Sequence, residues 1–171
     1  RSSDNALSVV HFGASGDKPT ASDFDGDGKT DVAVFRESEG NWYILNSGNN
    51  SFRVVRFGAV NDIPVPADYD GNRKTDIAIF RPSNGNWFVL RSNDFSFYSF
   101  PFGTGTDVPA PGDYDGDGRY DAGVFRPSNT TWFVNRSTAG TLIQAFGAAG
   151  AFFVYAVGSI APGDHVHVDN L

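Results

Sequence analysis

The chain has 171 residues, 40% of them hydrophobic, which is enough for a packed core and too apolar for a disordered chain. Its formal net charge is −7, it has no stripe of Lys and Arg, and it has no run of 18 apolar residues, so we expect neither a nucleic-acid partner nor membrane insertion. Cysteine is absent, which excludes a disulfide-stapled fold. Because the chain begins at Arg1 and lacks methionine, we expect a processed or excised segment whose signal peptide would already be removed.

In chain order, the first expected element is a strand at residues 6–12, which ends in a Phe-Gly pair. The same pair returns at residues 57–58, 102–103 and 146–147, and tryptophan recurs at 42, 87 and 132. The intervening short runs are rich in β-branched and aromatic residues and are bounded by Gly, Pro, Asn and Asp, which is typical of strands. Asn84-Gly85 separates two of these runs and favours a type I′ hairpin turn.

Each period of about 45 residues therefore holds four short strands, a pattern typical of propeller blades. No stretch has a helical apolar period. We predict an all-β fold of β-propeller-type four-stranded antiparallel blades, with three full repeats and two incomplete ends. The predicted boundaries are 1–13 for the last strand of an incomplete blade, 14–58, 59–103 and 104–147 for the repeats, and 148–171 for a divergent C-terminal β segment. Closed propellers have about four to eight blades, so three would not close a ring.

An acidic loop occurs once in each repeat, and its first residue is Asp23, Asp68 or Asp113. Oxygen-bearing side chains occupy positions 1, 3, 5 and 9, and position 7 offers its carbonyl, a ligand set that suits Ca²⁺ better than Mg²⁺. Three Ca²⁺ ions carry six positive charges, which would nearly offset the net charge of −7. The predicted ligands are Asp23, Asp25, Asp27, Lys29 and Asp31; Asp68, Asp70, Asn72, Lys74 and Asp76; and Asp113, Asp115, Asp117, Arg119 and Asp121.

These loops, with Phe-Gly at a fixed spacing, resemble the FG-GAP/VCBS repeats of integrin α-chain propellers and of secreted bacterial proteins. The resemblance extends from about Phe12 to Gly147 and implies a strand–strand hairpin that binds Ca²⁺ within a β-propeller. The second loop departs from the pattern, because Asn72 is neutral and Arg73 replaces a glycine at position 6, where the turn favours positive φ. We therefore expect the site at Asp68–Asp76 to bind Ca²⁺ most weakly.

Other recurring or paired residues have two interpretations each. The repeated tryptophans fit a core between blades better than sugar stacking. We expect the arginines at 36, 81 and 126 to bond to backbone carbonyls or to an aspartate of the neighbouring blade. This is a better explanation of them than binding of a ligand carboxylate. His165 and His167 form a candidate transition-metal pair with too few ligands. Asn49, Asn129 and Asn135 match the N-glycosylation acceptor pattern.

No motif of an enzyme occurs, and the aspartates fit calcium ligands better than a glycosidase carboxylate pair. We expect a non-enzymatic, extracellular or cell-surface calcium-binding module with a structural or adhesive role. It would assemble through open blade edges into a filament or surface array, with copies of itself or further repeats of a longer chain as partners. The competing possibility is that residues 148–171 and the N-terminal strand meet within one chain and make a small four-bladed ring. Glycans and cell-surface proteins are further expected partners. A lectin, and the propeller part of a larger secreted enzyme, are the alternatives.

Overall fold

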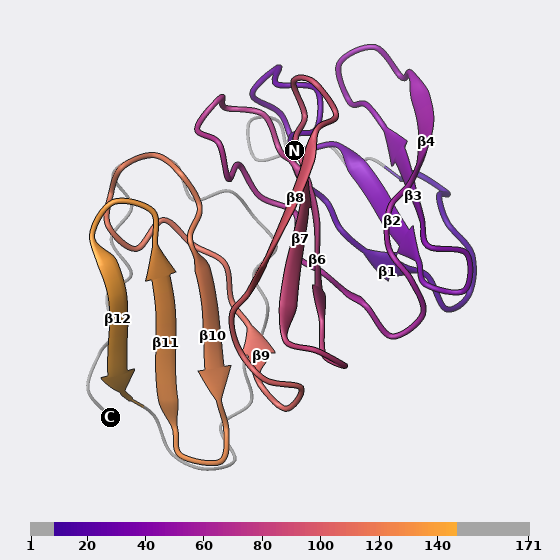
Figure 1. Cartoon of the computed structure of the whole chain (residues 1–171). Coiled ribbons are helices and arrows are strands. Elements are labelled where there is room, and N and C mark those ends of the chain that lie inside the picture. Colours follow the sequence, from indigo (N-terminus) through magenta and orange to yellow (C-terminus); the bar gives the residue numbers. More distant parts are fainter. Residues whose placement is uncertain (1–8, 147–171) are drawn as a thin grey trace.

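The computed structural model describes residues 9–146, and these form twelve β-strands and no helix (Figure 1). The strands make three four-stranded antiparallel sheets that follow one another along the chain, which confirms the all-β fold of propeller-type blades. Because this part of the chain is built from strands, it contains no helix of the length and apolarity that a membrane span requires.

The three sheets are blades 1, 2 and 3, and in each the strands pair in sequence order. Blade 1 contains β1 (Lys18–Pro19), β2 (Val32–Arg36), β3 (Asn41–Leu45) and β4 (Phe52–Arg56). Blade 2 contains β5 (Ile63–Pro64), β6 (Ile77–Arg81), β7 (Asn86–Leu90) and β8 (Phe97–Pro101). Blade 3 contains β9 (Val108–Pro109), β10 (Ala122–Arg126), β11 (Thr131–Arg136) and β12 (Gly140–Ala145).

An aromatic pair across the two middle strands sets the register of each blade. Phe35 lies opposite Trp42, with ring centroids 5.2 Å apart, and Phe80 lies opposite Trp87 at 5.6 Å. The third pair, in blade 3, has centroids 5.4 Å apart. Because strand side chains alternate between the two faces, a slip of one residue would move this pair away from the core.

The hairpin turn of blade 2 differs from the type I′ turn predicted for Asn84-Gly85. Its loop has four residues, 82–85, because Arg81 pairs with Asn86, and only Gly85 has positive φ, at 68°. A type I′ turn requires positive φ at both central residues, so the prediction was wrong. A side chain at position 85 would place Cβ 2.4 Å from the carbonyl oxygen of Gly103, so glycine is required there.

Blades 1 and 2 each pack one face, here called the forward face, on the rear face of the blade that follows. The forward face of blade 1 contributes Phe24, Ala33, Phe35, Trp42 and Ile44, which pack with Ile77 and Ile79 on the rear face of blade 2. The forward face of blade 2 contributes Tyr69, Ala78, Phe80, Trp87 and Val89, which pack with Ala122 and Val124 of blade 3. Trp42 and Trp87 are fully buried, which confirms their predicted place in the core between blades.

Both ends of the chain contain predictions that lie partly or wholly outside the described residues. Residues 9–12 belong to no strand, although the sequence predicts one at 6–12, and residues 6–8 are not described. Gly13 nevertheless lies against Val34 of blade 1, as Gly103 lies against Val124 of blade 3. The predicted segment 148–171, with both candidate histidine ligands, lies outside the described residues.

Candidate metal centres

The three acidic loops occupy one place in the blade architecture, between its first and second strands. A single β-bridge closes each loop, joining Ser22 to Asp31 in blade 1, with equivalent bridges that end at Asp76 and Asp121. The loops are therefore hairpin connections, as the family resemblance implies.

The first aspartate organises each loop by accepting hydrogen bonds from the loop's own backbone. In blade 1, Asp23 Oδ1 accepts from Gly26 N at 2.7 Å and Asp23 Oδ2 accepts from Gly28 N at 2.8 Å. The same positions donate to Asp68 and to Asp113, with distances of 2.6–3.0 Å. The chain is thus wrapped around one carboxylate, which turns the neighbouring odd-numbered side chains toward it.

The aspartate at position 9 is buried, with 0%, 0% and 2% of its surface exposed in the three loops. In blade 1, Asp31 Oδ2 accepts from Phe24 N at 2.9 Å, and Asp31 Oδ1 accepts from Ser47 N at 2.7 Å. Asp76 and Asp121 make the equivalent pairs of bonds. Position 9 therefore ties the acidic loop to the turn between the third and fourth strands, a role beyond the predicted one of ligand.

Position 6 is left-handed in all three loops, with φ of 80° at Gly28, 67° at Arg73 and 85° at Gly118. This agrees with the turn geometry predicted for that position. A non-glycine residue in this conformation costs about 1–2 kcal/mol, because its Cβ crowds the following carbonyl oxygen. Arg73 therefore strains the second loop.

Carboxylates from each loop come within 4.8 Å of one another, but the composition of the group differs between loops. The first loop brings together Asp23, Asp25 and Asp27, whereas the second and third use positions 1, 3 and 9. These groups are Asp68, Asp70 and Asp76, and Asp113, Asp115 and Asp121. Asp31 and Asp117, both predicted ligands, are not members of these groups of acidic side chains.

Position 5 bonds locally in every loop. Asp27 Oδ1, Asn72 Oδ1 and Asp117 Oδ1 each accept from the backbone amide two residues further on, at 2.8 Å. That amide belongs to the residue at position 7, whose backbone carbonyl is a predicted ligand of the cation. The residues at position 7 are Lys29, Lys74 and Arg119. The Lys74 and Arg119 side chains lie against glycines of the preceding loop, Gly26 and Gly71, and so are directed toward the neighbouring blade.

Burial raises the pKa of several carboxyl groups in the second and third loops. Burial raises the pKa of Asp76 to about 6, and the nearby charge of Asp70 adds to the rise. The hydrogen bond from Ser92 N acts in the other direction and lowers this pKa. Burial likewise raises the pKa of Asp68 and of Asp121. In contrast, the hydroxyl of Thr138 lowers the pKa of Asp115. A cation would favour the ionised form of every carboxylate in these groups.

The donor set of the loops fits a hard cation such as Ca²⁺. All of the grouped atoms are carboxylate oxygens, which Ca²⁺ prefers, and Ca²⁺ accepts irregular arrangements of such ligands. Asp115 Oδ1 is buried without a hydrogen-bond partner, although buried polar atoms are normally paired. Coordination to a cation would satisfy that atom. The oxygens that would hold Ca²⁺ in the third loop are therefore those of Asp113, Asp115 and Asp121.

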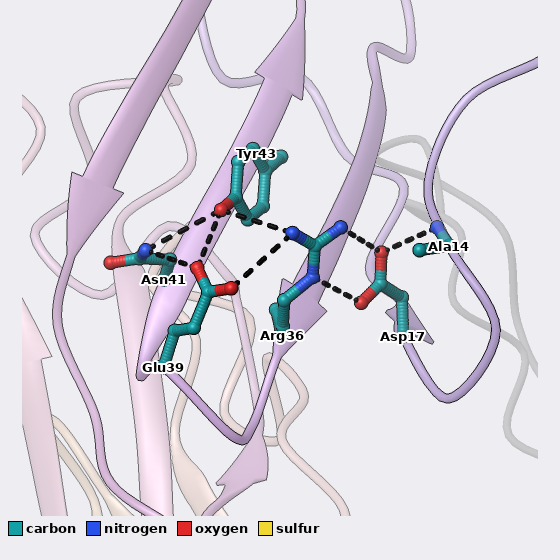
Figure 2. Close-up of polar contacts among 6 residues, drawn as sticks. All are labelled: Ala14, Asp17, Arg36, Glu39, Asn41 and Tyr43. Atoms are coloured by element: carbon teal, nitrogen blue, oxygen red, sulfur yellow. Dashed lines mark hydrogen bonds and ion pairs between the residues drawn. The ribbon is translucent and has the colours of Figure 1, made fainter.

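Each blade also contains an arginine–aspartate pair that the sequence analysis missed. Arg36 donates from Nε and Nη2 to the two oxygens of Asp17, at 2.8 and 3.0 Å, and Asp17 also accepts from Ala14 N (Figure 2). On its other side, Arg36 contacts Tyr43 and Glu39. The equivalent pairs are Arg81–Asp62 and Arg126–Asp107.

The partner of each arginine comes from the same repeat, so the prediction of an aspartate from the neighbouring blade was wrong. The spacing of Asp17, Asp62 and Asp107, 45 residues in each case, was the available signal. Their side chains are 4%, 1% and 0% exposed, so they complete the fold and are not a free ligand site.

Comparison with protein families places these loops in a known repeat. A family described as FG-GAP-like repeat matches residues 23–79 and again residues 68–124, which together make up more than half of the chain. The chain belongs to the FG-GAP-like repeat family. Each FG-GAP match begins at the first aspartate of an acidic loop and extends into the second strand of the following blade. Comparisons with curated proteins and with solved structures gave no match.

Proposed function

We propose that this FG-GAP chain is a non-enzymatic, calcium-stabilised module that acts outside the cell in a structural or adhesive role. The observation that carries the proposal is the repeated convergence of three carboxylates at the same hairpin of each blade. Three equivalent sites favour a structural role over unique chemistry, because a catalytic centre needs only one such constellation.

A cation in these loops would brace the blade through contacts that are already visible. In blade 3, Asp115 Oδ2 accepts from Thr138 N, Thr138 Oγ1 and Ala139 N, which belong to the turn between β11 and β12. Ser137 Oγ donates to Asp117 Oδ2 at 2.6 Å in the same turn. Binding Ca²⁺ through Asp113, Asp115 and Asp121 would hold two hairpins of one blade together.

The proposed extracellular location rests on the calcium affinity expected of such sites. Oxygen-only calcium sites of extracellular modules bind with dissociation constants of about 10⁻⁴–10⁻³ M, so they are filled outside cells and remain empty at cytosolic calcium levels. For this chain we propose copies of itself or further repeats as structural partners, with glycans or cell-surface proteins as adhesive partners.

A shallow pocket of about 480 Å³ bears on the lectin alternative. It is lined by Asp17, Arg36, Glu37 and small neighbours. Arg36 is paired with Asp17 at 2.8 Å, and Glu37 with Lys18 at 2.6 Å. Because its charges are already paired, this pocket favours a structural role over sugar recognition.

Thermal unfolding with and without calcium tests the proposal. At a tenfold excess over the dissociation constant, each site would add about 1.4 kcal/mol, so three sites would raise the melting temperature by roughly ten degrees. The matched control carries Asp25→Asn, Asp70→Asn and Asp115→Asn, and its melting temperature should not respond to calcium. A melting temperature of the unaltered chain that is the same in calcium and in excess chelator would overturn the proposal.

A further inference from the structure

The last strand of each blade carries a different kind of side chain at one equivalent position. The residues at this position pair with Ile44, Val89 and Val134, which are 45 residues apart. They are an arginine, a tyrosine and a leucine: Arg53 in blade 1, Tyr98 in blade 2 and Leu142 in blade 3. Of the three described blades, blade 1 alone has a permanent positive charge at this position.

Arg53 lies beside the first acidic loop. Its Nη2 donates to the carbonyl oxygen of Phe24, the second residue of that loop, at 3.0 Å. The amide of Phe24 in turn donates to Asp31 Oδ2 at 2.9 Å. Burial lowers the pKa of Arg53, and the charges of Asp31 and Asp25 oppose that shift. The guanidinium therefore interacts with positions 9 and 3 of the loop, from which calcium ligands are predicted.

The charge of Arg53 is not neutralised by a direct partner. Among the described residues it forms no ion pair, and its Nε is buried without a hydrogen-bond partner. Arg36, in contrast, bonds to Asp17 through two nitrogens. Because arginine keeps its charge at any ordinary pH, the charge of Arg53 remains available to act on the first loop.

Tyr98 shows that the equivalent position of blade 2 also faces the acidic loop of its own blade. Burial raises the pKa of Tyr98, and the charges of Asp76 and Asp70, positions 9 and 3 of the second loop, add to the rise. In blade 3, Leu142 is half-buried and brings no charge to the third loop. One position therefore presents a cation, a neutral hydroxyl and an apolar side chain to three similar loops.

The loop of the following blade also docks on each of the first two loops. Thr75 N donates to Asp23 O at 2.8 Å, and the equivalent bond joins Tyr120 N to Asp68 O at 2.7 Å. The preceding residue of blade 2, Lys74, lies against the first loop at the same contact. The first loop thus has a second basic neighbour, so substitutions at position 53 itself are needed to isolate the effect of Arg53.

We infer that Arg53 sets the calcium affinity of the first loop: its fixed positive charge opposes the binding of a divalent cation, so the third loop binds calcium more tightly. The inference rests on the proposed calcium-binding function, and it separates two loops whose aspartates have the same spacing. Without calcium, the same charge reduces the repulsion among the carboxylates of the first loop. Blade 1 is braced by its own arginine, whereas blade 3 depends on calcium.

Titration calorimetry on chains with one intact loop tests the inference. Asp70→Asn with Asp115→Asn leaves the first loop intact, and Asp25→Asn with Asp70→Asn leaves the third. The chain with the third loop should bind calcium about tenfold more tightly than the chain with the first. In the first-loop chain, Arg53→Gln should raise the affinity roughly tenfold, since it removes the repelling charge. Arg53→Lys keeps the charge and should change the affinity by less than about threefold.

Arg56→Gln is the matched control in the first-loop chain. Arg56 lies on the same strand as Arg53, but it is exposed and pairs with Asn41, at the end of the sheet away from the loop. It carries the same charge, so a general effect of net charge would appear in both variants. The reverse change is made in the third-loop chain, where Leu142→Arg should lower the affinity roughly tenfold and the neutral Leu142→Gln should not.

Melting temperatures give a second readout, which a merely structural role of Arg53 would not produce. In chelator, Arg53→Gln should lower the melting temperature of the otherwise unaltered chain, because Asp25 and Asp31 lose a positive neighbour. Calcium should restore most of that loss, so the rise caused by calcium should be larger in Arg53→Gln than in the unaltered chain. An equal loss with and without calcium would mean that Arg53 only packs the blade, and the inference would be wrong.

The remaining outcomes separate the inference from the proposed function. The inference is overturned if Arg53→Gln leaves the calcium affinity of the first loop unchanged or lowers it, or if Arg56→Gln raises it as much. The proposed function still stands after that result if the third-loop chain binds calcium. If no loop of the unaltered chain binds calcium, the proposed function and the inference are both wrong.

Discussion

Blades 2 and 3 carry the same aromatic pair across their middle strands, Phe80–Trp87 and Phe125–Trp132, yet the burial of the two tryptophans differs. Trp87 is fully buried, with its indole N–H donating to Phe102 O at 2.8 Å, whereas Trp132 is only partly buried. Tyr69 and Tyr114 differ in the same sense. The difference lies in the neighbour, because blade 2 is covered on both faces within the described chain. The apolar residues of blade 2 pack with those of both neighbouring blades, so much of its stability belongs to the interfaces that it shares.

As calcium sites, the acidic loops of these two blades are expected to rank the other way round, with that of blade 3 ahead. The loop of blade 2 is the more buried, and burial raises the pKa of its Asp68 and Asp76. It also carries Arg73 in a left-handed conformation, where blade 3 has Gly118. Burial of the second loop therefore disfavours the ionised form of its carboxyl groups. The two loops should differ in calcium affinity as a result.

The largest expected effect separates the two tryptophans. Trp87→Ala should lower the free energy of unfolding by about 3–5 kcal/mol, since it removes a fully buried aromatic side chain. Trp132→Ala should cost clearly less, because part of that ring is already in contact with solvent. Urea unfolding of monomeric samples measures both losses, with Trp42→Ala as a control that should match Trp87→Ala. Equal losses at positions 87 and 132 would contradict the comparison.

An exchange at position 6 tests the two loops. Arg73→Gly should relieve about 1–2 kcal/mol of strain. It should raise the calcium affinity of the second loop by up to about 30-fold, the limit for strain that only the bound loop carries. Gly118→Arg should lower the affinity of the third loop by a similar factor. Titration calorimetry measures both affinities. Because Asn72→Asp adds a charge without changing the turn, it separates the two proposed causes of the weaker binding expected at this loop. If Arg73→Gly leaves the affinity unchanged, strain is not the cause.

The hairpin turns of blades 2 and 3 allow a second exchange. Thr130 has φ of 53° at the position where Gly85 has 68°, so Thr130→Gly should stabilise blade 3 by about 1 kcal/mol. Gly85→Thr should destabilise blade 2, because its Cβ would approach the carbonyl oxygen of Gly103. Melting temperatures in chelator, which removes any effect of calcium, measure both changes. A loss of stability in Thr130→Gly would contradict the expectation.

The smallest expected effect concerns acid stability. Burial alone would raise the pKa of Asp107, but the hydrogen bonds from Arg126 and Thr104 outweigh it and lower the pKa. A folded-state pKa below the unfolded value of about 3.9 gives stability that is fully present above pH 4 and is lost as pH falls through the folded value. Asp107→Asn should therefore flatten the loss of stability below pH 4 in urea unfolding. An unchanged slope would assign acid unfolding to other carboxylates.

The sequence predicted what depends on local pattern. The period of 45 residues, the four strands of each repeat and the left-handed position 6 all follow from residue types at fixed spacings. The predicted turn at Asn84-Gly85 was wrong because pairing of Arg81 with Asn86 decides the loop length, and that pairing depends on the whole sheet. The sequence also placed Arg81 in the repeat correctly, and the 45-residue period shared by Asp62 was the unused signal for its partner.

The sequence predicted which residue types line the candidate metal sites. It did not predict which carboxylates come together in each loop. Aspartates at odd positions indicate a cation loop, yet the sequence does not show that Asp31 lies outside the first group or that Asp117 lies outside the third. Asp117 accepts a hydrogen bond from Ser137 Oγ in the turn between the third and fourth strands, a contact that depends on how two hairpins pack. The bond from Ser47 N to Asp31 recurs at Asp76 and Asp121, so it ties position 9 to that turn without deciding which carboxylates form the group. Serine at 47, 92 and 137 keeps the same period and was the signal for that contact.

The docking of one loop on the next has an evolutionary consequence. It uses a backbone amide, a backbone carbonyl and a glycine, with only the stem of a basic side chain added. Lys74 makes this contact at one interface and Arg119 at the other, so the contact is compatible with either basic residue. A tandem duplication of one 45-residue unit would insert a new blade whose two faces already match its neighbours, so arrays of this kind can change their length before they change their sequence.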